Sequence, residues 1–223
     1  MGMSKKRVIA LIPTKNEEES IRRVITQVRP YMDKILIVDG HSKDKTVKIA
    51  KKEGAEIMFQ EGKGKGMGFQ TFLKKYPIKE DELYIMLDGD ASYPAEDIPI
   101  FLENLKEYEI VSGKRKGVRF KLKNIIHFIG NKIISLLGFL LYGKYIDICT
   151  GMWGFRGNVL KSMKISAKGF ELEADLFINM CRLKLKSKEV LIDYFPRIGE
   201  EKLRESDGFR IIYFLIKKKL FVN

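Results

Sequence analysis

Two aspartates separated by one glycine, Asp88 and Asp90, form the clearest chemical signal in the chain. They directly follow the apolar run Tyr84–Leu87, which is typical of a buried strand. Gly89 between them permits a sharp turn that can aim both carboxylates at one point. Because like charges this close repel each other, a divalent cation is the usual remedy, and Mg²⁺ or Mn²⁺ prefers a few carboxylate oxygens completed by phosphates and water. Such pairs also occur in ordinary turns, but the position after a strand favours a metal site.

Three further polar segments begin where an apolar run ends. The segment from Pro13 to Glu17 offers free backbone N–H groups and polar side chains to a ligand, although it can equally be a simple helix start. Asp39 ends the second run, where a carboxylate can accept a hydrogen bond from a nucleobase or a ribose hydroxyl. Lys65 lies in a glycine-rich loop that lacks the GxxxxGK[ST] spacing of a P-loop. That loop can hold a diphosphate or be a solvated turn.

These polar segments belong to an alternation of short apolar runs and amphipathic stretches. The predicted strands are Val8–Ile12, Ile35–Val38, Ala55–Phe59, Tyr84–Leu87, Ile110–Ser112 and Glu189–Ile192. The predicted helices are Glu17–Val28, Asp44–Glu53, Gly66–Lys75, Ile98–Glu107 and Glu171–Leu183. The alternation predicts an α/β fold with a mostly parallel sheet flanked by helices. Ligands of such sheets bind beyond the carboxyl ends of the strands, so the polar segments are expected to meet at one edge.

Basic and apolar stretches dominate the second half of the chain. Lys114–Lys123 is mostly basic, and Asn124–Tyr142 is mostly apolar with a polar stripe at four-residue spacing formed by His127, Asn131 and Ser135. Polar side chains inside a bilayer are costly, so residues 114–142 are expected to form a membrane-interface insertion rather than a span. The tail 209–223, which contains three consecutive lysines, is expected to be a second amphipathic interfacial helix. The alternative is that both stretches are buried core helices.

Composition narrows the class of protein and of partner. The 223 residues are 45% hydrophobic and 32% charged, which indicates a globular chain, interpreted as one domain over residues 1–223. A formal net charge of +13 favours anionic partners: nucleic acid, acidic lipid headgroups or phosphorylated small molecules. A basic module that binds nucleic acid or a membrane without catalysis remains an alternative, but it leaves Asp88 and Asp90 unexplained. Cys149 and Cys181 lack metal spacing and no signal-peptide core follows the N-terminus, so a cytosol-facing protein is expected.

In order and spacing, these segments resemble the motifs of the family 2 inverting glycosyltransferases of GT-A fold, and look most like the dolichyl- and polyprenyl-phosphate sugar synthases. The matching segments are residues 13–18 (P-x-x-N-E), 38–46 (V-D-D/G-x-S-x-D-x-T), 64–66 (G-K-G), 87–90 (D-x-D), 112–115 (S/G-x-R), 150–156 (T-G-hydrophobic-x-x-F-R) and 197–203 (R-x-G-E-S-K-L). Each motif is weak alone, but the ordered set spans roughly residues 8–205.

The resemblance implies a role for each matching residue. The nucleotide-sugar is expected to be held by Pro13, Thr14, Glu17, Asp39, Lys65, Asp88, Gly89 and Lys202. Asp88, Asp90 and Ser92 are expected at the Mg²⁺ or Mn²⁺ ion. Asp90, Arg115 and Arg197 are expected to act in catalysis, the two arginines by contacting donor or acceptor phosphates.

The resemblance therefore implies a metal-dependent hexosyltransferase that moves a sugar from a nucleotide-sugar to a dolichyl or polyprenyl phosphate. It would act as a peripheral protein at the cytoplasmic face of an anionic membrane, and nucleic acid is not an expected partner. Two positions depart from the family pattern: Glu201 replaces the usual Ser, and Ser92 stands where mannose synthases place Gln. These departures leave the identity of the donor sugar open, whereas the D-G-D form of the aspartate pair looks more like relatives that use UDP-sugars and so favours a UDP-sugar slightly over GDP-mannose. A hydroxyl acceptor is the alternative, with Asp147, Glu171 or Glu173 as the base.

Overall fold

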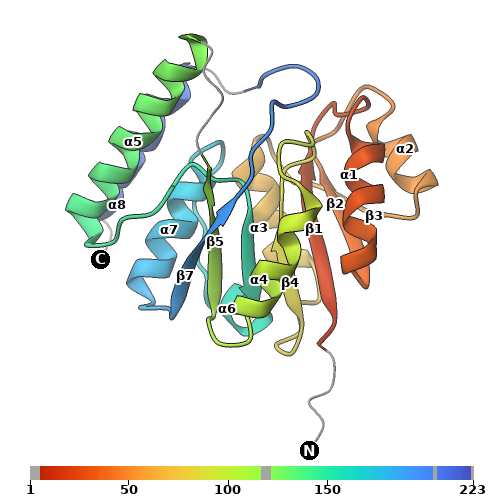
Figure 1. The fold of residues 1–223 in the computed structure, drawn as a ribbon, viewed down its shortest axis with the longest axis horizontal. Helices are drawn as coiled ribbons and strands as arrows, with labels where there is room; N and C mark the ends of the chain where they lie inside the picture. The colour runs from red at the N-terminus through yellow and green to blue at the C-terminus, as the bar shows by residue number, and fades with distance from the viewer. Residues whose placement is uncertain (1–5, 117–121, 203–204, 222–223) are drawn as a thin grey trace, which may run out of the picture.

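One sheet organises the chain (Figure 1). The structure, a computed structural model, describes residues 6–116, 122–202 and 205–221, and within them the side chains of 6–116, 129–202 and 206–221. The seven strands lie in the order β3-β2-β1-β4-β6-β5-β7. They are β1 Val8–Thr14, β2 Lys34–Asp39, β3 Glu56–Phe59, β4 Leu83–Met86, β5 Ile110–Arg115, β6 Trp153–Arg156 and β7 Ser187–Ile192. All are parallel except β6, which runs antiparallel to β4 and β5, so the predicted mostly parallel α/β sheet is confirmed.

Helices cover both faces of this sheet, because each central strand is apolar on both sides. Within β1, Ile9 and Leu11 enter one core, whereas Ala10 and Ile12 enter the other. One face is covered by α1 Ile21–Val28, α2 Thr46–Lys52 and α4 Ile98–Asn104. The other is covered by α3 Lys65–Lys75, α6 Gly157–Ser162 and α7 Leu172–Arg182. Two short 3₁₀ turns, Arg29–Tyr31 and Ala95–Asp97, complete the first layer.

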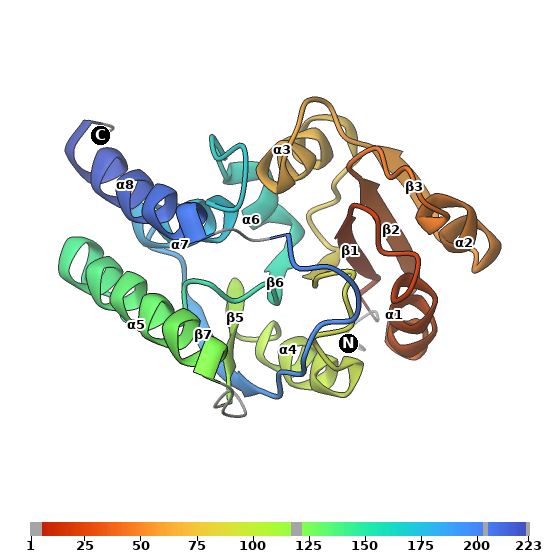
Figure 2. The same ribbon diagram turned by 90° about the horizontal axis from the view of Figure 1, so that it is seen from above.

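Two longer helices, α5 Leu122–Tyr142 and α8 Glu205–Phe221, lie side by side beyond α7 (Figure 2). Each packs one apolar side on the core, through Ile134 of α5 and Ile211 and Leu215 of α8. Each also exposes apolar side chains on its outer side: Ile129, Ile133, Leu136, Phe139 and Leu140 on α5, and Phe209, Tyr213, Ile216, Leu220 and Phe221 on α8. Core packing and an apolar outer surface therefore coexist on the same two helices. Among the described residues, no helix combines the length and the apolar character needed to cross a bilayer.

The expected membrane insertion lies only partly within the described residues. Residues 117–121 of the basic run are outside them, as are the side chain of His127 and residues 222–223 of the tail. The rest of the predicted polar stripe is not exposed as a unit. Ser135 is buried and Asn131 is half-buried against the body of the protein, because this side of α5 faces the core.

Three elements differ from the expectation. The helix expected from Glu17 begins at Ile21, after a turn over residues 18–20 in which the backbone N–H of Ser20 donates to the Glu17 carbonyl at 3.1 Å. The strand β6 and the helix α6 were not predicted. β6 exists through antiparallel pairing with β4 and β5, for example Trp153 with Met86, which are distant in sequence. The pattern of apolar and polar residues within one segment does not show which distant strand that segment pairs with.

We predict that Phe72→Ala, which empties a fully buried position between α3 and the sheet, lowers the free energy of unfolding by about 3–5 kcal/mol. Urea denaturation followed by the fluorescence of the single tryptophan, Trp153, measures this loss. Phe59→Ala, at a half-exposed position on the edge strand β3, is the control and is expected to cost less than about 1 kcal/mol. Equal losses for the two variants would contradict the assigned core.

Candidate active site

The carboxyl ends of β1, β2 and β4 meet at one edge of the sheet, at the top of Figure 1. The loops that leave them contain three non-glycine residues with positive φ, namely Asn16 at 52°, His41 at 60° and Ala91 at 60°. Such conformations are uncommon and concentrate at functional sites. The segment that follows β7 crosses above these loops, where the backbone N–H of Ile198 donates to the carbonyl of Asp90 at 2.9 Å. The polar segments therefore lie together at one edge of the sheet, as expected.

Asp39, at the end of β2, is fully buried. Its carboxylate accepts hydrogen bonds from the Thr14 hydroxyl at 3.1 Å, the Ser42 hydroxyl at 2.6 Å and the Ser42 backbone N–H at 2.8 Å. These donors tie the end of β1 to the loop after β2. Asp39 thus fixes the shape of this edge.

Glu17 is a buried carboxylate shared by two cations from the far end of the chain. The Arg197 guanidinium donates to Glu17 at 3.1 and 3.3 Å, and the Lys202 ammonium also donates to it. Burial raises the pKa of Glu17, while Lys202 and Arg197 oppose that shift. Arg197 also lies 3.7 Å from Asp90, and its Nε is buried without a hydrogen-bond partner among the described residues. An anionic ligand oxygen would satisfy this nitrogen.

The turn after β4 holds the aspartate pair. Asp90 accepts hydrogen bonds from the backbone N–H and the hydroxyl of Ser92, at 3.0 and 2.6 Å. Ser92 is itself buried and aims its hydroxyl at Asp90, so it positions that carboxylate. The left-handed residue of the turn is Ala91 rather than Gly89. Gly89 is needed for space instead, because a Cβ there would lie 2.8 Å from the Thr14 side chain.

Asp88 is paired with a lysine that also contacts a third carboxylate. The Lys65 ammonium lies 2.5 Å from Asp88 Oδ1 and 2.6 Å from Glu173 Oε1. Burial alone would lower the pKa of Lys65, but the charges of Asp88 and Glu173 outweigh it and raise that pKa well above its usual value. The lysine is therefore a fixed cation of the site.

The position of Lys65 depends on a loop packed against the start of α3. The backbone N–H groups of Gly66 and Met67 donate to the carbonyls of Gly169 and Lys168 at 3.1 and 3.0 Å. The buried Asp175 of α7 holds this loop by accepting from the backbone N–H groups of residues 166 and 167 at 2.6 and 2.8 Å. The same α7 carries Glu173, so one helix orients both the loop and the lysine.

The aspartate pair fits a divalent cation that a substrate completes. Hard carboxylate oxygens are the donors that Mg²⁺ and Mn²⁺ prefer, and these ions commonly bind one or two carboxylates together with substrate phosphates. Among the residues that the structure describes, no cluster of three or more acidic, histidine or cysteine side chains could hold a metal by itself. Asp88 and Asp90 offer oxygen donors of the kind that these ions prefer.

Arg115 lies at the end of β5. Its guanidinium makes two hydrogen bonds of 2.8 Å to Asp147 and stacks on the ring of Tyr194. A polar cavity of about 50 Å³ opens beside it. The lining residues are Lys114, Arg115, Asn131, Lys132, Ser135, Tyr145, Ile146 and Asp147. This basic pocket lies between the end of β5 and α5, the helix with the apolar outer side.

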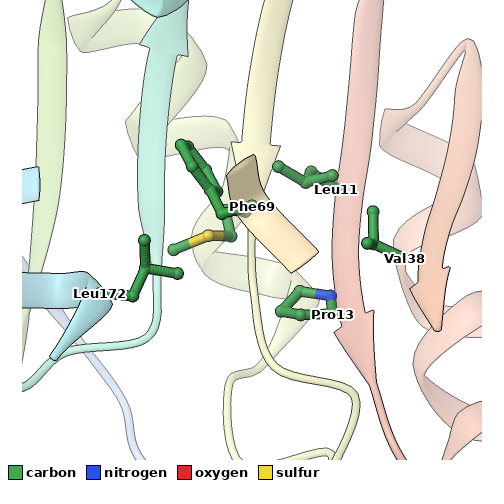
Figure 3. A pocket seen from close by; sticks show the side chains of 6 residues that line it. Leu11, Pro13, Val38, Phe69 and Leu172 are labelled. Atoms are coloured by element: carbon green, nitrogen blue, oxygen red, sulfur yellow. The ribbon is translucent and has the colours of Figure 1, made fainter. Parts of the chain in front are cut away.

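Pro13 lines a different and purely apolar cavity under the strand ends (Figure 3). The cavity measures about 10 Å³, and its walls are Leu11, Pro13, Val38, Phe69, Met86 and Leu172. A site of this size, with apolar side chains all around, does not suit even one water molecule. It is a small packing gap between the sheet and α3, and the contribution of Pro13 is structural here.

Three residues that shape the site were not predicted from the sequence: Ser42, Tyr194 and Asp175. Glu173 was considered only as a possible base, whereas the structure places it on Lys65. Its one signal in the sequence is an acidic residue between two apolar ones in a helix, Leu172 and Ala174. That signal is too common to indicate a site.

Known proteins resemble this chain in both sequence and fold. The model of glycosyl transferase family 2 matches residues 9–163. The chain is 30% identical to glycosyltransferase AglJ of Haloferax volcanii over 85% of its own length, and it spans 63% of the length of that protein. It is 28% identical to the UDP-N-acetylglucosamine–dolichyl-phosphate N-acetylglucosaminyltransferase of Methanococcus voltae, with 98% of both chains covered.

A solved structure shows the same architecture. It is glucosyl-3-phosphoglycerate synthase from Mycobacterium tuberculosis, crystallised with Mn²⁺, UDP and glucosyl-3-phosphoglycerate. The TM-score is 0.75 at 18% identity, and the match covers 98% of this chain and 81% of that one. At this identity the likeness concerns the fold, and it confirms the expected GT-A architecture.

We predict that Gly66→Ala destabilises the protein and moves α3. Alanine is favoured over glycine within a helix by about 1 kcal/mol, but a Cβ at this position would lie 2.2 Å from the Ala167 carbonyl oxygen. The clash is expected to prevail, with a net loss of at least about 1 kcal/mol. Thermal and urea melts measure it. Gly130→Ala in α5, where a Cβ meets nothing within 4 Å, is the control and should be neutral or slightly stabilising. Unchanged stability of Gly66→Ala would contradict the tight docking of α3.

Proposed function

The chain belongs to glycosyltransferase family 2, and on that premise we propose that it moves a sugar from a nucleotide-sugar to a dolichyl or polyprenyl phosphate. The observation that carries the proposal is the charged cluster at the strand ends, where Asp88, Asp90 and Glu17 stand beside three cations from two distant segments. Those cations are Lys65, Arg197 and Lys202. A diphosphate leaving group needs this combination of metal-binding carboxylates and phosphate-binding cations.

The proposed reaction is an in-line displacement at the anomeric carbon, with inversion and release of the nucleoside diphosphate. A Mg²⁺ or Mn²⁺ ion on Asp88 and Asp90 would neutralise charge that develops on the departing diphosphate. Arg197 would support the same charge, because its guanidinium lies 3.7 Å from Asp90, one of the two carboxylates that would hold the ion. Ser92 keeps the Asp90 carboxylate in place.

A phosphate acceptor fits the arrangement of carboxylates better than a hydroxyl acceptor. A phosphate monoester with a second pKa of about 6 is largely a dianion at neutral pH and needs no general base. The three candidate bases for a hydroxyl are all engaged: Asp147 with Arg115, Glu173 with Lys65, and Glu171 with the backbone N–H groups of residues 168 and 169. A hydroxyl acceptor would need one of these paired carboxylates as its base.

The basic pocket beside Arg115 supports a place for the acceptor phosphate. It combines lysine, arginine and asparagine side chains with one wall made by α5. A lipid tail that leaves this pocket would meet the exposed apolar side of α5 and α8. We therefore propose that the protein works as a peripheral protein on an anionic membrane, with the outer sides of both helices in the interface. The cytoplasmic face is favoured because Cys149 and Cys181 are free thiols.

A UDP-sugar is the slightly preferred donor. The relative from Methanococcus voltae, which matches along nearly its whole length, carries UDP-N-acetylglucosamine in its name. The test of the whole proposal is a transfer assay in which UDP- and GDP-sugars are offered with dolichyl phosphate, undecaprenyl phosphate or a polyprenol, with Mn²⁺ or EDTA. Transfer to the phosphates alone, dependent on Mn²⁺, is the expected result. No product from any donor would overturn the proposal.

We predict that Asp90→Asn lowers kcat/KM for sugar transfer at least about 100-fold, because a neutral amide holds neither the metal nor the Arg197 guanidinium as well as a carboxylate does. Asp81→Asn is the matched control, since Asp81 is exposed at the opposite end of β4. It should leave transfer unchanged. Circular dichroism melts establish that both variants fold, and near-normal turnover of Asp90→Asn would contradict the metal role.

We also predict that Leu140→Ser and Phe209→Ser each weaken binding to phosphatidylglycerol-containing vesicles about tenfold or more. Both side chains are more than two-thirds exposed, and transfer of a large apolar side chain into the interface contributes about 1.5–3 kcal/mol. Vesicle co-sedimentation measures the effect. Ile100→Ser, at an exposed position on α4 far from the two helices, is the control. Equal binding by all three variants would exclude this surface as the membrane contact.

A further inference from the structure

Lys65 occupies Oδ1 of Asp88, one of the carboxylate oxygens that a metal ion would need. Its ammonium is 2.5 Å from Asp88 Oδ1, and its side chain is 14% exposed, so it is not a solvent-facing lysine that swings freely. The second oxygen at hydrogen-bond distance, Glu173 Oε1 at 2.6 Å, comes from the first turn of α7 and is also buried. The ammonium is therefore bound between two carboxylates from different layers of the fold.

Charge balance in the cluster explains why a lysine is present there. Four carboxylates face three cations: Glu17, Asp88, Asp90 and Glu173 against Lys65, Arg197 and Lys202. The cluster is thus close to neutral before any ligand arrives. A divalent ion alone would add two positive charges beside the Lys65 ammonium, and like charges at such distances repel strongly in a partly buried site. A nucleoside diphosphate that arrives with the ion compensates that excess.

We propose that Lys65 is a resident cation of the donor site, displaced from Asp88 only when a divalent metal arrives together with a nucleoside diphosphate, and that Glu173 is the positioning residue that retains the displaced ammonium beside the diphosphate. This inference rests on the proposed function, since it presupposes a metal on Asp88. It adds a competing cation, a positioning residue and an order of binding. The metal binds weakly to the free protein and tightly in the presence of the nucleotide.

The substitution Lys65→Gln tests the competition directly. It removes the ammonium and leaves Asp88 and Glu173, which had both contacted the same nitrogen, close together and without a cation. Two adjacent carboxylates attract a divalent ion. Lys74→Gln is the matched control, because Lys74 lies on the same helix and also pairs with a carboxylate, Glu61, but is exposed.

Mn²⁺ binding is measured by electron paramagnetic resonance of the free ion, without nucleotide and with saturating UDP or GDP. For the wild type and Lys74→Gln, nucleotide is expected to tighten Mn²⁺ binding at least tenfold. For Lys65→Gln, Mn²⁺ alone is expected to bind at least tenfold more tightly than to the wild type, so that the tightening by nucleotide shrinks. If Lys65→Gln binds Mn²⁺ alone no better than the wild type, the inference is overturned while the proposed function stands.

Glu173→Gln provides a second test that does not depend on the folding of Lys65→Gln. With Glu173 neutral, the displaced ammonium loses its retaining carboxylate, so the Mn²⁺–nucleotide complex should bind at least about fivefold more weakly. In transfer assays KM for the nucleotide-sugar should rise more than kcat falls, with an unchanged melting temperature as the sign of an intact fold. A fall in kcat as large as the rise in KM, in fold-change, would refute the positioning role. If the wild type binds no Mn²⁺ even with nucleotide, both this inference and the metal dependence of the proposed function are refuted. The transferase activity itself is tested separately, by the transfer assay.

Discussion

Buried carboxylates that require compensation are the constraint on which the rest of this structure depends. Asp39, Glu17 and Glu173 are buried at or near the carboxyl edge of one sheet, and Asp88 beside them is only partly exposed, so solvent contributes little to neutralising them. Uncompensated burial of a carboxylate is costly, so each must find donors or cations within the protein. Asp39 uses two hydroxyls and a backbone N–H, and the others use lysine and arginine. The loops that supply those groups are thereby fixed against the sheet.

This compensation links distant parts of the chain to one place. Lys65 comes from α3, Glu173 from α7, and Arg197 and Lys202 from the segment after β7. That segment is also bonded through its backbone to the turn of Asp90 and Ser92. A partly buried, charged cluster is well suited to stabilise a departing diphosphate, because its dipoles and charges are already oriented before the reaction starts. The interactions that hold the free protein together are thus the ones that the proposed reaction would use.

The α5–α8 pair provides the second notable arrangement. Its inner side belongs to the main core, and its outer side exposes large apolar residues next to the basic pocket at the end of β5. Exposed apolar patches of this extent mark sites of interaction with membranes or proteins. Lys218 of α8 approaches the buried Asp175 to 3.8 Å, and Asp175 holds the loop on which α3 and Lys65 rest. The outer helix and the charged cluster are therefore joined by a short chain of contacts.

The sequence by itself determined the alternation of β1, β2, β3 and β4 with their helices, since apolar runs and amphipathic stretches are local features of the chain. It also determined the aspartate pair after β4, the position of Lys65 and the family, since these are ordered motifs. Only the tertiary structure decided that β6 runs antiparallel between β4 and β5, because that pairing joins segments far apart in sequence. The same holds for the burial of Asp39, the placement of Glu173 on Lys65, the pairing of Arg115 with Asp147 and the two-sided role of α5. Each of these depends on which side chains meet across elements. The sequence shows a charged residue but not the partner that neutralises it, and an apolar residue but not the element that packs over it.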